Sequence, residues 1–189
     1  MEVELNGAEI ASQPSQRPWA LLASLALASG TLSRSELAGR FWPDVLDQSA
    51  RASLRSALWA LRRELDEWLI ADGDRVGLRE GSELWVDVRE FDRLAADHEC
   101  EQALALCRGE LLEGLEDEWA LLARARHRER VIELMEQLAC ACEERGEARA
   151  AIEWSRRQIG RDPLDEDAAR RLIARLGAAG YSSPANLAK

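Results

Sequence analysis

Apolar residues recur at the spacing of one helical face along residues 48–68. They stand three or four positions apart and are Leu54, Ala57, Leu58, Leu61 and Leu65. This spacing predicts an amphipathic helix that buries one apolar stripe against the rest of its domain. We therefore expect one long helix here, fading near Trp68.

Arginines gather on a second face of the same expected helix. At about 100° per residue, Arg51, Arg55 and Arg62 lie together, with Trp59 beside them. A recognition helix needs such an arrangement, because its stripe docks on the domain while guanidinium groups reach phosphates and the O6/N7 edge of guanine. An ordinary amphipathic helix with solvated arginines is an equally simple interpretation of this segment alone.

Two shorter helices are expected before this one. Pro18 is suited to the first turn of a helix, and Gly30 ends that helix. Ser33 and Glu36 form the S-x-x-E pattern of a capping box, which starts a second helix that runs through Phe41. Two helices, a turn and a long third helix make a helix-turn-helix core.

Short β-rich segments stand on both sides of the three helices. Residues 1–10 alternate weakly and predict one short strand. After the third helix, LIADGDRVGL (69–78) and ELWVDV (83–88) are separated by turn residues and predict the two strands of a hairpin. A hairpin at this place is a wing, so the order of elements predicts a winged helix-turn-helix domain over residues 1–92.

The second half of the chain has a helical pattern with a regular period. Gly146 and Gly180 stand 34 residues apart, and Ala151 and Ala185 keep the same interval. This interval is the tetratricopeptide period. An arbitrary amphipathic helical bundle is the alternative. We expect a mostly α protein in which an all-α, tetratricopeptide-like repeat domain over residues 93–189 follows the winged helix.

The net charge argues against DNA binding, whereas the local charge argues for it. The 189 residues carry a formal net charge of −10, and affinity for duplex DNA is largely electrostatic. Within residues 33–63, however, six arginines face three acidic residues. A basic ridge on an acidic body is expected to bind DNA weakly alone and with a strong dependence on salt.

Catalytic, metal and cofactor sites are not indicated. There is no phosphate-cradling glycine loop and no Gly-x-Ser-x-Gly motif, and the four cysteines and two histidines lack zinc-finger spacing. We expect no enzymatic activity, no metal, no cofactor and reduced thiols. No apolar run approaches the roughly 20 residues of a membrane span, and the acidic start lacks a signal-peptide pattern. These features predict a cytoplasmic protein with no membrane partner.

Three strings carry a family resemblance by their order and spacing. They are FWPD at 41–44, SARASLRSALWALR at 49–62 and VDVREF at 86–91. Together they resemble the OmpR-type winged helix of the antibiotic-regulatory-protein family of bacterial transcriptional activators. Residues 103–131 resemble the helical bacterial transcriptional activator domain that follows this winged helix in the same family. The resemblance implies a transcriptional activator that binds double-stranded DNA, self-associates on direct repeats and contacts RNA polymerase.

The expected DNA contacts lie mainly on the arginine helix. Arg51 and Arg55, in its N-terminal half, are candidates for base edges, and Arg62 and Arg63 for phosphates. The complete set of candidate DNA-binding residues is Arg51, Ser53, Arg55, Ser56, Trp59, Arg62, Arg63 and Arg75. The alternative is a protein-interaction module or signalling scaffold whose winged helix does not bind DNA productively, which the acidic wing favours.

The last repeat stops partway along its second helix, at Lys189. A repeat array without its terminal cap exposes apolar surface. Four residues are therefore expected to be partly uncovered, namely Leu172, Ile173, Leu176 and Leu187. Either a second copy, giving a homodimer, or a C-terminal extension of a longer protein would cover them.

Overall fold

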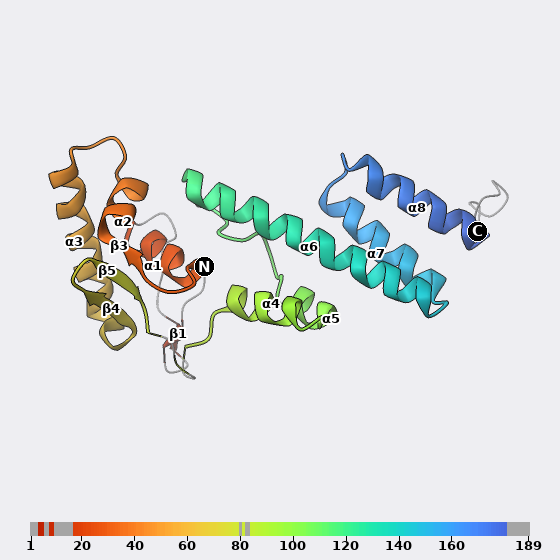
Figure 1. Ribbon diagram of the computed structural model, residues 1–189, viewed down its shortest axis with the longest axis horizontal. Coiled ribbons are helices and arrows are strands. Elements are labelled where there is room, and N and C mark those ends of the chain that lie inside the picture. Colours follow the sequence, from red (N-terminus) through yellow and green to blue (C-terminus); the bar gives the residue numbers. More distant parts are fainter. Residues whose placement is uncertain (1–3, 6–7, 10–16, 80, 82–83, 181–189) are drawn as a thin grey trace. The chain divides into compact units, whose positions relative to one another are not determined.

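The computed structural model describes residues 4–5, 8–9, 17–79, 81 and 84–180 (Figure 1). The chain divides into two compact units, one made of Met1–Glu90 and Gly109–Arg124, the other of Phe91–Arg108 and Ala125–Lys189. Two helices, α4 (Asp87–Ala96) and α6 (Glu118–Glu144), have residues in both units.

The first unit has the helices and sheet of a winged helix. Its elements are β1 (Glu4–Leu5), β2 (Ala8–Glu9), α1 (Arg17–Leu27), β3 (Leu32–Ser33), α2 (Arg34–Phe41), α3 (Asp47–Leu65), the 3-10 turn η1 (Asp66–Trp68), β4 (Leu69–Asp72) and β5 (Arg75–Leu78). The strands β3, β5 and β4 form an antiparallel sheet in that order. Leu32 pairs with Val76 and Leu69 pairs with Leu78. The mostly α fold and the winged helix predicted from the sequence are confirmed.

The apolar stripe of α3 is buried as predicted. All five stripe residues have little exposure, and Leu54 and Leu61 are only 1% and 2% exposed. They pack in one hydrophobic cluster with side chains from α1, α2 and β5, such as Leu21, Phe41 and Val76. This cluster is the core of the first unit, and it orients α3.

Residues 109–124 also contribute to this unit. The side chain of Arg124 donates hydrogen bonds to the carbonyl oxygens of Leu111, Leu112 and Leu115, at 3.0, 2.7 and 3.0 Å. Leu115 and Ala120 are buried in the same core cluster as the α3 stripe. An arginine that satisfies three carbonyl groups holds this irregular segment in one conformation.

The β-rich segments differ from the sequence-based expectation. The whole hairpin lies within residues 69–78, where Gly73 adopts a left-handed φ of 53° in a two-residue turn between β4 and β5. The segment ELWVDV is not its second strand, because residues 84–86 form no strand and Asp87 begins α4. The Asp87 carboxylate lies in the first turn of α4, where a negative charge is favourable, and accepts a hydrogen bond from the Val88 N–H at 2.7 Å. The single N-terminal strand is likewise wrong, since β1 and β2 pair with each other.

Two local features lie beside β3: the capping box at the start of α2 and the close approach of Gly77 to Thr31. The capping box at the start of α2 is present as predicted, with the Ser33 hydroxyl accepting from the Glu36 N–H and the Glu36 carboxylate accepting from the Ser33 N–H. Gly77 lies in β5 against β3, where a Cβ atom would come within 2.8 Å of Thr31 Cγ2. A side chain at Gly77 would require the Thr31 side chain or the facing backbone to move.

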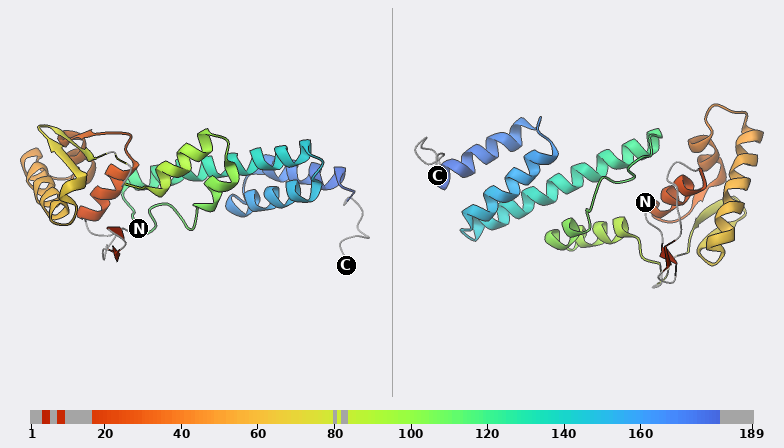
Figure 2. Two further views of the ribbon diagram at one scale, coloured as in Figure 1. Left: turned by 90° about the horizontal axis from the view of Figure 1, so that it is seen from below. Right: turned by 180° about the vertical axis from the view of Figure 1, so that it is seen from behind.

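The second unit is all helical. Its elements are the C-terminal part of α4, α5 (Cys100–Ala105), most of α6, α7 (Ala148–Arg161) and α8 (Glu166–Ala178). Figure 2 shows that α7 and α8 follow α6 as successive antiparallel helices. Gly146 and Gly180, the glycines paired by the 34-residue interval, both take a left-handed φ, 76° and 80°, directly after helices. Two residues of the sequence-based expectations lie outside the described residues: Ala185, the partner of Ala151 in this interval, and Leu187, which was expected to be partly uncovered.

Apolar side chains are packed at one end of this unit and partly exposed at the other. Apolar side chains of α4, α5 and α6 form one cluster, which includes Phe91, Ala103 and Leu134. At the other end, the α8 residue Ile173 is 69% exposed, while Leu172 and Leu176 are half-buried. This agrees with the expected uncovered apolar surface for the described residues.

A buried arginine joins α8 to α6 and α7. Arg175 is 6% exposed, and its guanidinium donates to Glu136 at 2.7 Å, Glu143 at 2.9 Å and the Ser155 hydroxyl at 2.7 Å. Burial alone would raise the pKa of Glu136, but the hydrogen bonds and charge of Arg175 outweigh it and hold the pKa below its usual value. No local pattern in the sequence predicts this network.

No described helix combines the length and the apolar character needed to cross a membrane. Among the described residues, no group of three or more His, Cys, Asp or Glu side chains could hold a metal ion. The four cysteines are free thiols.

We expect the substitution Gly77→Ala to destabilise the first unit by about 1–3 kcal/mol, because the new methyl group would overlap Thr31. The matched control is Gly39→Ala in α2, where a Cβ meets no atom within 4 Å. Alanine has the higher helix propensity there, so Gly39→Ala should raise stability by about 0.5–1 kcal/mol. Thermal melts of both variants check the two signs, and a neutral Gly77→Ala would contradict the close approach of the strands.

We expect Arg175→Gln to cost about 1–3 kcal/mol, because it removes the charged hydrogen bonds that the buried guanidinium donates to Glu136 and Glu143. The control Arg170→Gln, on the same helix, breaks exposed pairs with Glu166 and Asp167 and should cost at most about 1 kcal/mol. Chemical denaturation measures both, and equal losses would contradict a buried network.

The ion pair between Arg175 and Glu136 predicts that the stability of the fold depends on pH. Because the folded pKa of Glu136 is lowered, its contribution to stability is present above the ordinary carboxyl pKa and is lost as the pH falls through the lowered value. Unfolding curves between neutral and acid pH should therefore lose more stability in the parent protein than in Arg175→Gln. Parallel losses would indicate that Glu136 does not stabilise the fold.

Candidate nucleic-acid interface

The helix α3 presents one face to its own domain and another to solvent. Its hydrogen-bonded length, Asp47–Leu65, includes all candidate residues except Arg75. Its first turn has no side-chain cap, and the Leu46 carbonyl accepts from the N–H groups of Ser49 and Ala50. The packing of the stripe against α1 and α2 therefore sets the rotation of this helix about its axis.

The solvent face of α3 is basic and has no acidic residue on it. A projection at about 100° per residue places Arg51, Arg62 and Arg55 next to one another, followed by Trp59 and Arg63. All five side chains are exposed. The acidic residues of α3 are Asp47 and Glu64. In the same projection Asp47 is aligned with the apolar stripe, at the exposed N-terminal end of the helix, and Glu64 falls beside the stripe. A strip of four guanidinium groups thus follows the helix.

The four arginines differ in their partners. Arg51 pairs with Asp47 at 3.0 Å, and both side chains are exposed. The Arg63 guanidinium lies 5.5 Å from the ring centroid of Trp59, a cation–π contact. Arg55 and Arg62 are exposed, and neither has an ion-pair or hydrogen-bond partner among the described residues. These two are the basic groups most available to an anion.

The polar and aromatic candidates lie on or near the same face. Ser56 is exposed and donates to the Ala52 carbonyl oxygen at 3.2 Å within the helix, while Ser53 is half-buried. Trp59 is 64% exposed, although a tryptophan usually buries much of its ring. Its indole is therefore a flat apolar surface among the arginines.

The wing candidate, Arg75, stands apart from this strip. It is exposed on β5, and its Nε donates to the Thr31 hydroxyl at 2.9 Å while its Nη2 donates to the Thr31 carbonyl. These contacts fasten the wing to the chain before β3. The wing turn also carries the exposed acids Asp72 and Asp74, so the wing is a poorer site for phosphate than α3.

One residue of the interface was not anticipated. Asp47 stands four positions before Arg51, and its carboxylate pairs with the Arg51 guanidinium of the arginine strip. The i, i+4 spacing of an acid and an arginine was present in the sequence and could have predicted this pair. Asp47 draws Arg51 toward the helix start and lowers the positive potential there.

Comparison with known families gives one result for the second half of the chain. Residues 86–186 match the family model described as "Bacterial transcriptional activator domain". This match covers more than half of the 189 residues. None of the curated proteins compared with the chain is significantly similar to it.

We expect Arg55→Ala and Arg62→Ala to change the free energy of unfolding by no more than about 0.5 kcal/mol, because both side chains are exposed and lie off the buried stripe. Leu54→Ala, one residue from Arg55, should instead cost about 2–5 kcal/mol. Thermal melts followed by circular dichroism compare the three variants. A loss for Arg55→Ala as large as that for Leu54→Ala would mean that the arginine holds the fold.

Proposed function

Because the chain belongs to the bacterial transcriptional activator domain family, which is typical of the antibiotic-regulatory-protein activators, we propose that it regulates transcription by binding double-stranded DNA through α3. The observation that carries this proposal is the solvent face of α3, with four arginines, an exposed tryptophan and no acidic residue. Residues 1–92 are the DNA-binding domain in this proposal, and residues 93–189 are the helical activator domain.

In this proposal α3 enters the major groove, which is wide enough for a helix. Arg51 and Arg55, in the N-terminal half of α3, donate to base edges, where an arginine forms two hydrogen bonds with guanine O6 and N7. Arg62 and Arg63 bind phosphates. Each phosphate contact fixes the register of the protein on the duplex without reading its sequence.

The remaining candidates have supporting roles. Ser53 and Ser56 make short polar contacts, and Trp59 packs against the sugar–phosphate backbone or a thymine methyl group. Arg75 already uses two of its nitrogen atoms on Thr31, so we assign it a secondary phosphate contact from the wing.

Charge sets the strength of this binding. The chain as a whole carries −10, which opposes approach to DNA, but acidic groups farther than about 8–10 Å from the duplex are largely screened at physiological salt. The exposed pair between Arg51 and Asp47 is worth only about 0.3–0.5 kcal/mol. Arg51 can therefore leave Asp47 for a stronger anionic partner at little cost.

The helical domain mediates protein contacts in this proposal. Self-association would place two arginine helices on one DNA site, and contact with RNA polymerase would make the regulator an activator. The exposed Ile173, beside the half-buried Leu172 and Leu176, supports a further covering element, supplied by a second copy or by a C-terminal extension.

A protein-interaction module that does not bind DNA productively is the second candidate function. The acidic wing turn, with Asp72 and Asp74 exposed beside the hairpin, favours it. In that case the arginine strip is only a solvated helix face. The two functions differ in one measurable property, which is salt-dependent affinity for duplex DNA.

We expect the full chain to bind random-sequence duplex at low salt, with an affinity that falls as salt rises. Arg62→Ala should weaken binding to all sequences about equally and lower the salt slope by about one unit. Arg55→Ala should cost about 1–3 kcal/mol on a selected site and relax preference at one base position. Asp47→Asn should act in the opposite direction and strengthen binding, because it removes a negative charge and releases Arg51.

The matched control is Arg170→Ala on α8, which removes one exposed arginine from the helical domain and should leave the salt slope unchanged. Fluorescence anisotropy with labelled duplex at several salt concentrations measures every variant. The protein-interaction module would be favoured if no binding is seen at low salt. It would also be favoured if Arg55→Ala, Arg62→Ala and Asp47→Asn all leave the binding unaltered.

A further inference from the structure

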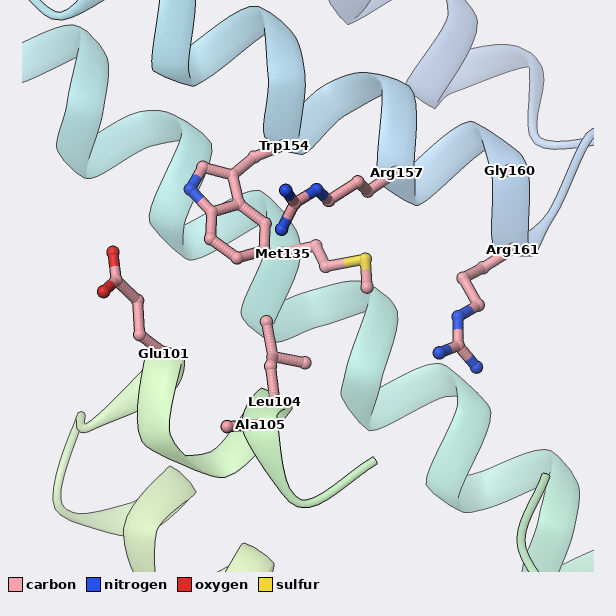
Figure 3. Close-up of a pocket in the computed structure, with 8 residues that line it drawn as sticks. All are labelled: Glu101, Leu104, Ala105, Met135, Trp154, Arg157, Gly160 and Arg161. Atoms are coloured by element: carbon pink, nitrogen blue, oxygen red, sulfur yellow. The ribbon is translucent and has the colours of Figure 1, made fainter. Parts of the chain in front are cut away.

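A cavity of about 600 Å³ lies among α5, α6 and α7 in the second unit (Figure 3). Small-molecule sites in proteins commonly occupy roughly 300–1,000 Å³ and combine apolar walls with a few polar groups. This cavity lies wholly within the helical domain and uses none of the residues assigned to DNA binding. Its chemistry can therefore be considered separately from the proposed function.

Three large apolar side chains line part of the cavity. Leu104 comes from α5, Met135 from α6 and Trp154 from α7, and Figure 3 shows their side chains facing the same space. Met135 is 7% exposed, and Trp154 packs against the core cluster that contains it. A thioether is polarisable and adapts to flat groups, and an indole offers a flat face for stacking. These walls favour a ligand with a flat apolar body.

Two guanidinium groups lie on the α7 side of this cavity. Arg157 lies 4.7 Å from the ring centroid of Trp154 and pairs with Glu153 at 3.3 Å, both side chains being about half exposed. Arg161 has no ion-pair or hydrogen-bond partner among the described residues. Figure 3 shows both guanidinium groups directed from α7 toward the cavity. The single acidic lining residue is Glu101, on α5.

The lining is therefore positive although the chain carries −10. An exposed i, i+4 pair such as that between Arg157 and Glu153 contributes little, so a ligand anion can replace Glu153 as the partner of Arg157. Arginine binds carboxylate and sulfonate groups through two parallel hydrogen bonds. The arginines supply recognition of an anion at the α7 side of this space, beside the apolar side chains.

We propose that this cavity binds a small organic anion with a flat apolar body, of the aryl carboxylate class. The body packs against Met135, Leu104 and Trp154, and the anionic group lies between Arg157 and Arg161. Such a ligand touches α5, α6 and α7 at once, so it stabilises the folded helical domain in proportion to its occupancy.

The test is a competition experiment on the full chain. The probe is 8-anilinonaphthalene-1-sulfonate, a flat anion that fluoresces in apolar sites. The competitors are 1-naphthoate and the neutral 1-naphthalenemethanol, which have the same ring system and differ in charge. We expect naphthoate to displace the dye at concentrations at least about tenfold lower than the alcohol, because charged hydrogen bonds to arginine are the stronger ones.

Variants locate the site. Arg161→Gln should weaken naphthoate about tenfold and leave the alcohol unchanged, because it removes a charge and no apolar wall. Gly160 lines the cavity, and a Cβ built on it meets no atom within 4 Å. Gly160→Leu should therefore fill the space and abolish displaceable dye binding, whereas Gly160→Ala should fold normally and retain it.

Two controls change residues that lie outside the cavity. Ile173→Ser removes an exposed apolar residue on α8 outside the cavity and should leave naphthoate displacement unchanged. Arg170→Gln removes an exposed arginine outside the cavity and should also have no effect. The proposal is overturned if the dye does not bind, if both competitors displace it equally, or if Gly160→Leu and Arg161→Gln behave as the parent protein. None of these outcomes depends on whether the chain binds DNA.

Discussion

The first unit depends on one constraint, which is that α3 is buried along a single stripe. Leu54, Leu58 and Leu61 are each no more than 4% exposed and share one cluster with side chains of α1, α2 and the sheet. Burying each of these leucines is worth about 1.5–3 kcal/mol. A rotation of α3 by one residue, roughly 100°, would expose the leucines and bury guanidinium groups, which is very costly. The packing of the core therefore fixes which residues of α3 face solvent.

In the second unit, a buried arginine contributes to helix packing beside the apolar cluster. Arg175 joins α8 to α6 and α7 through two carboxylates and a hydroxyl, all within 2.9 Å. Buried ion pairs seldom add much net stability, but an unpaired member is very unfavourable. In the observed registry of α8 this guanidinium has all three of these partners.

Features decided by neighbouring residues could be predicted from the sequence. The capping box at Ser33 and the stripe and arginine face of α3 follow from spacings of three and four. Features decided by distant contacts could not. Arg175 and Glu136 are 39 positions apart and Arg75 and Thr31 are 44 apart, so neither the buried network nor the anchoring of the wing had a local signal. The segment 83–88 has strand-forming residues, yet Asp87 begins the helix α4 there.

Trp59 is a direct reporter of the solvent face of α3, the face that we propose contacts duplex DNA. Seven tryptophans give seven indole N–H signals, and Trp59→Phe identifies the one at position 59. In a titration of the labelled protein with random-sequence duplex at low salt, we expect the Trp59 signal to shift, while the signals of buried Trp19 and of Trp154 in the helical domain stay in place. If the duplex binds without moving the Trp59 signal, α3 does not contact it through this face. If the spectrum does not change at any duplex concentration, the chain does not bind DNA.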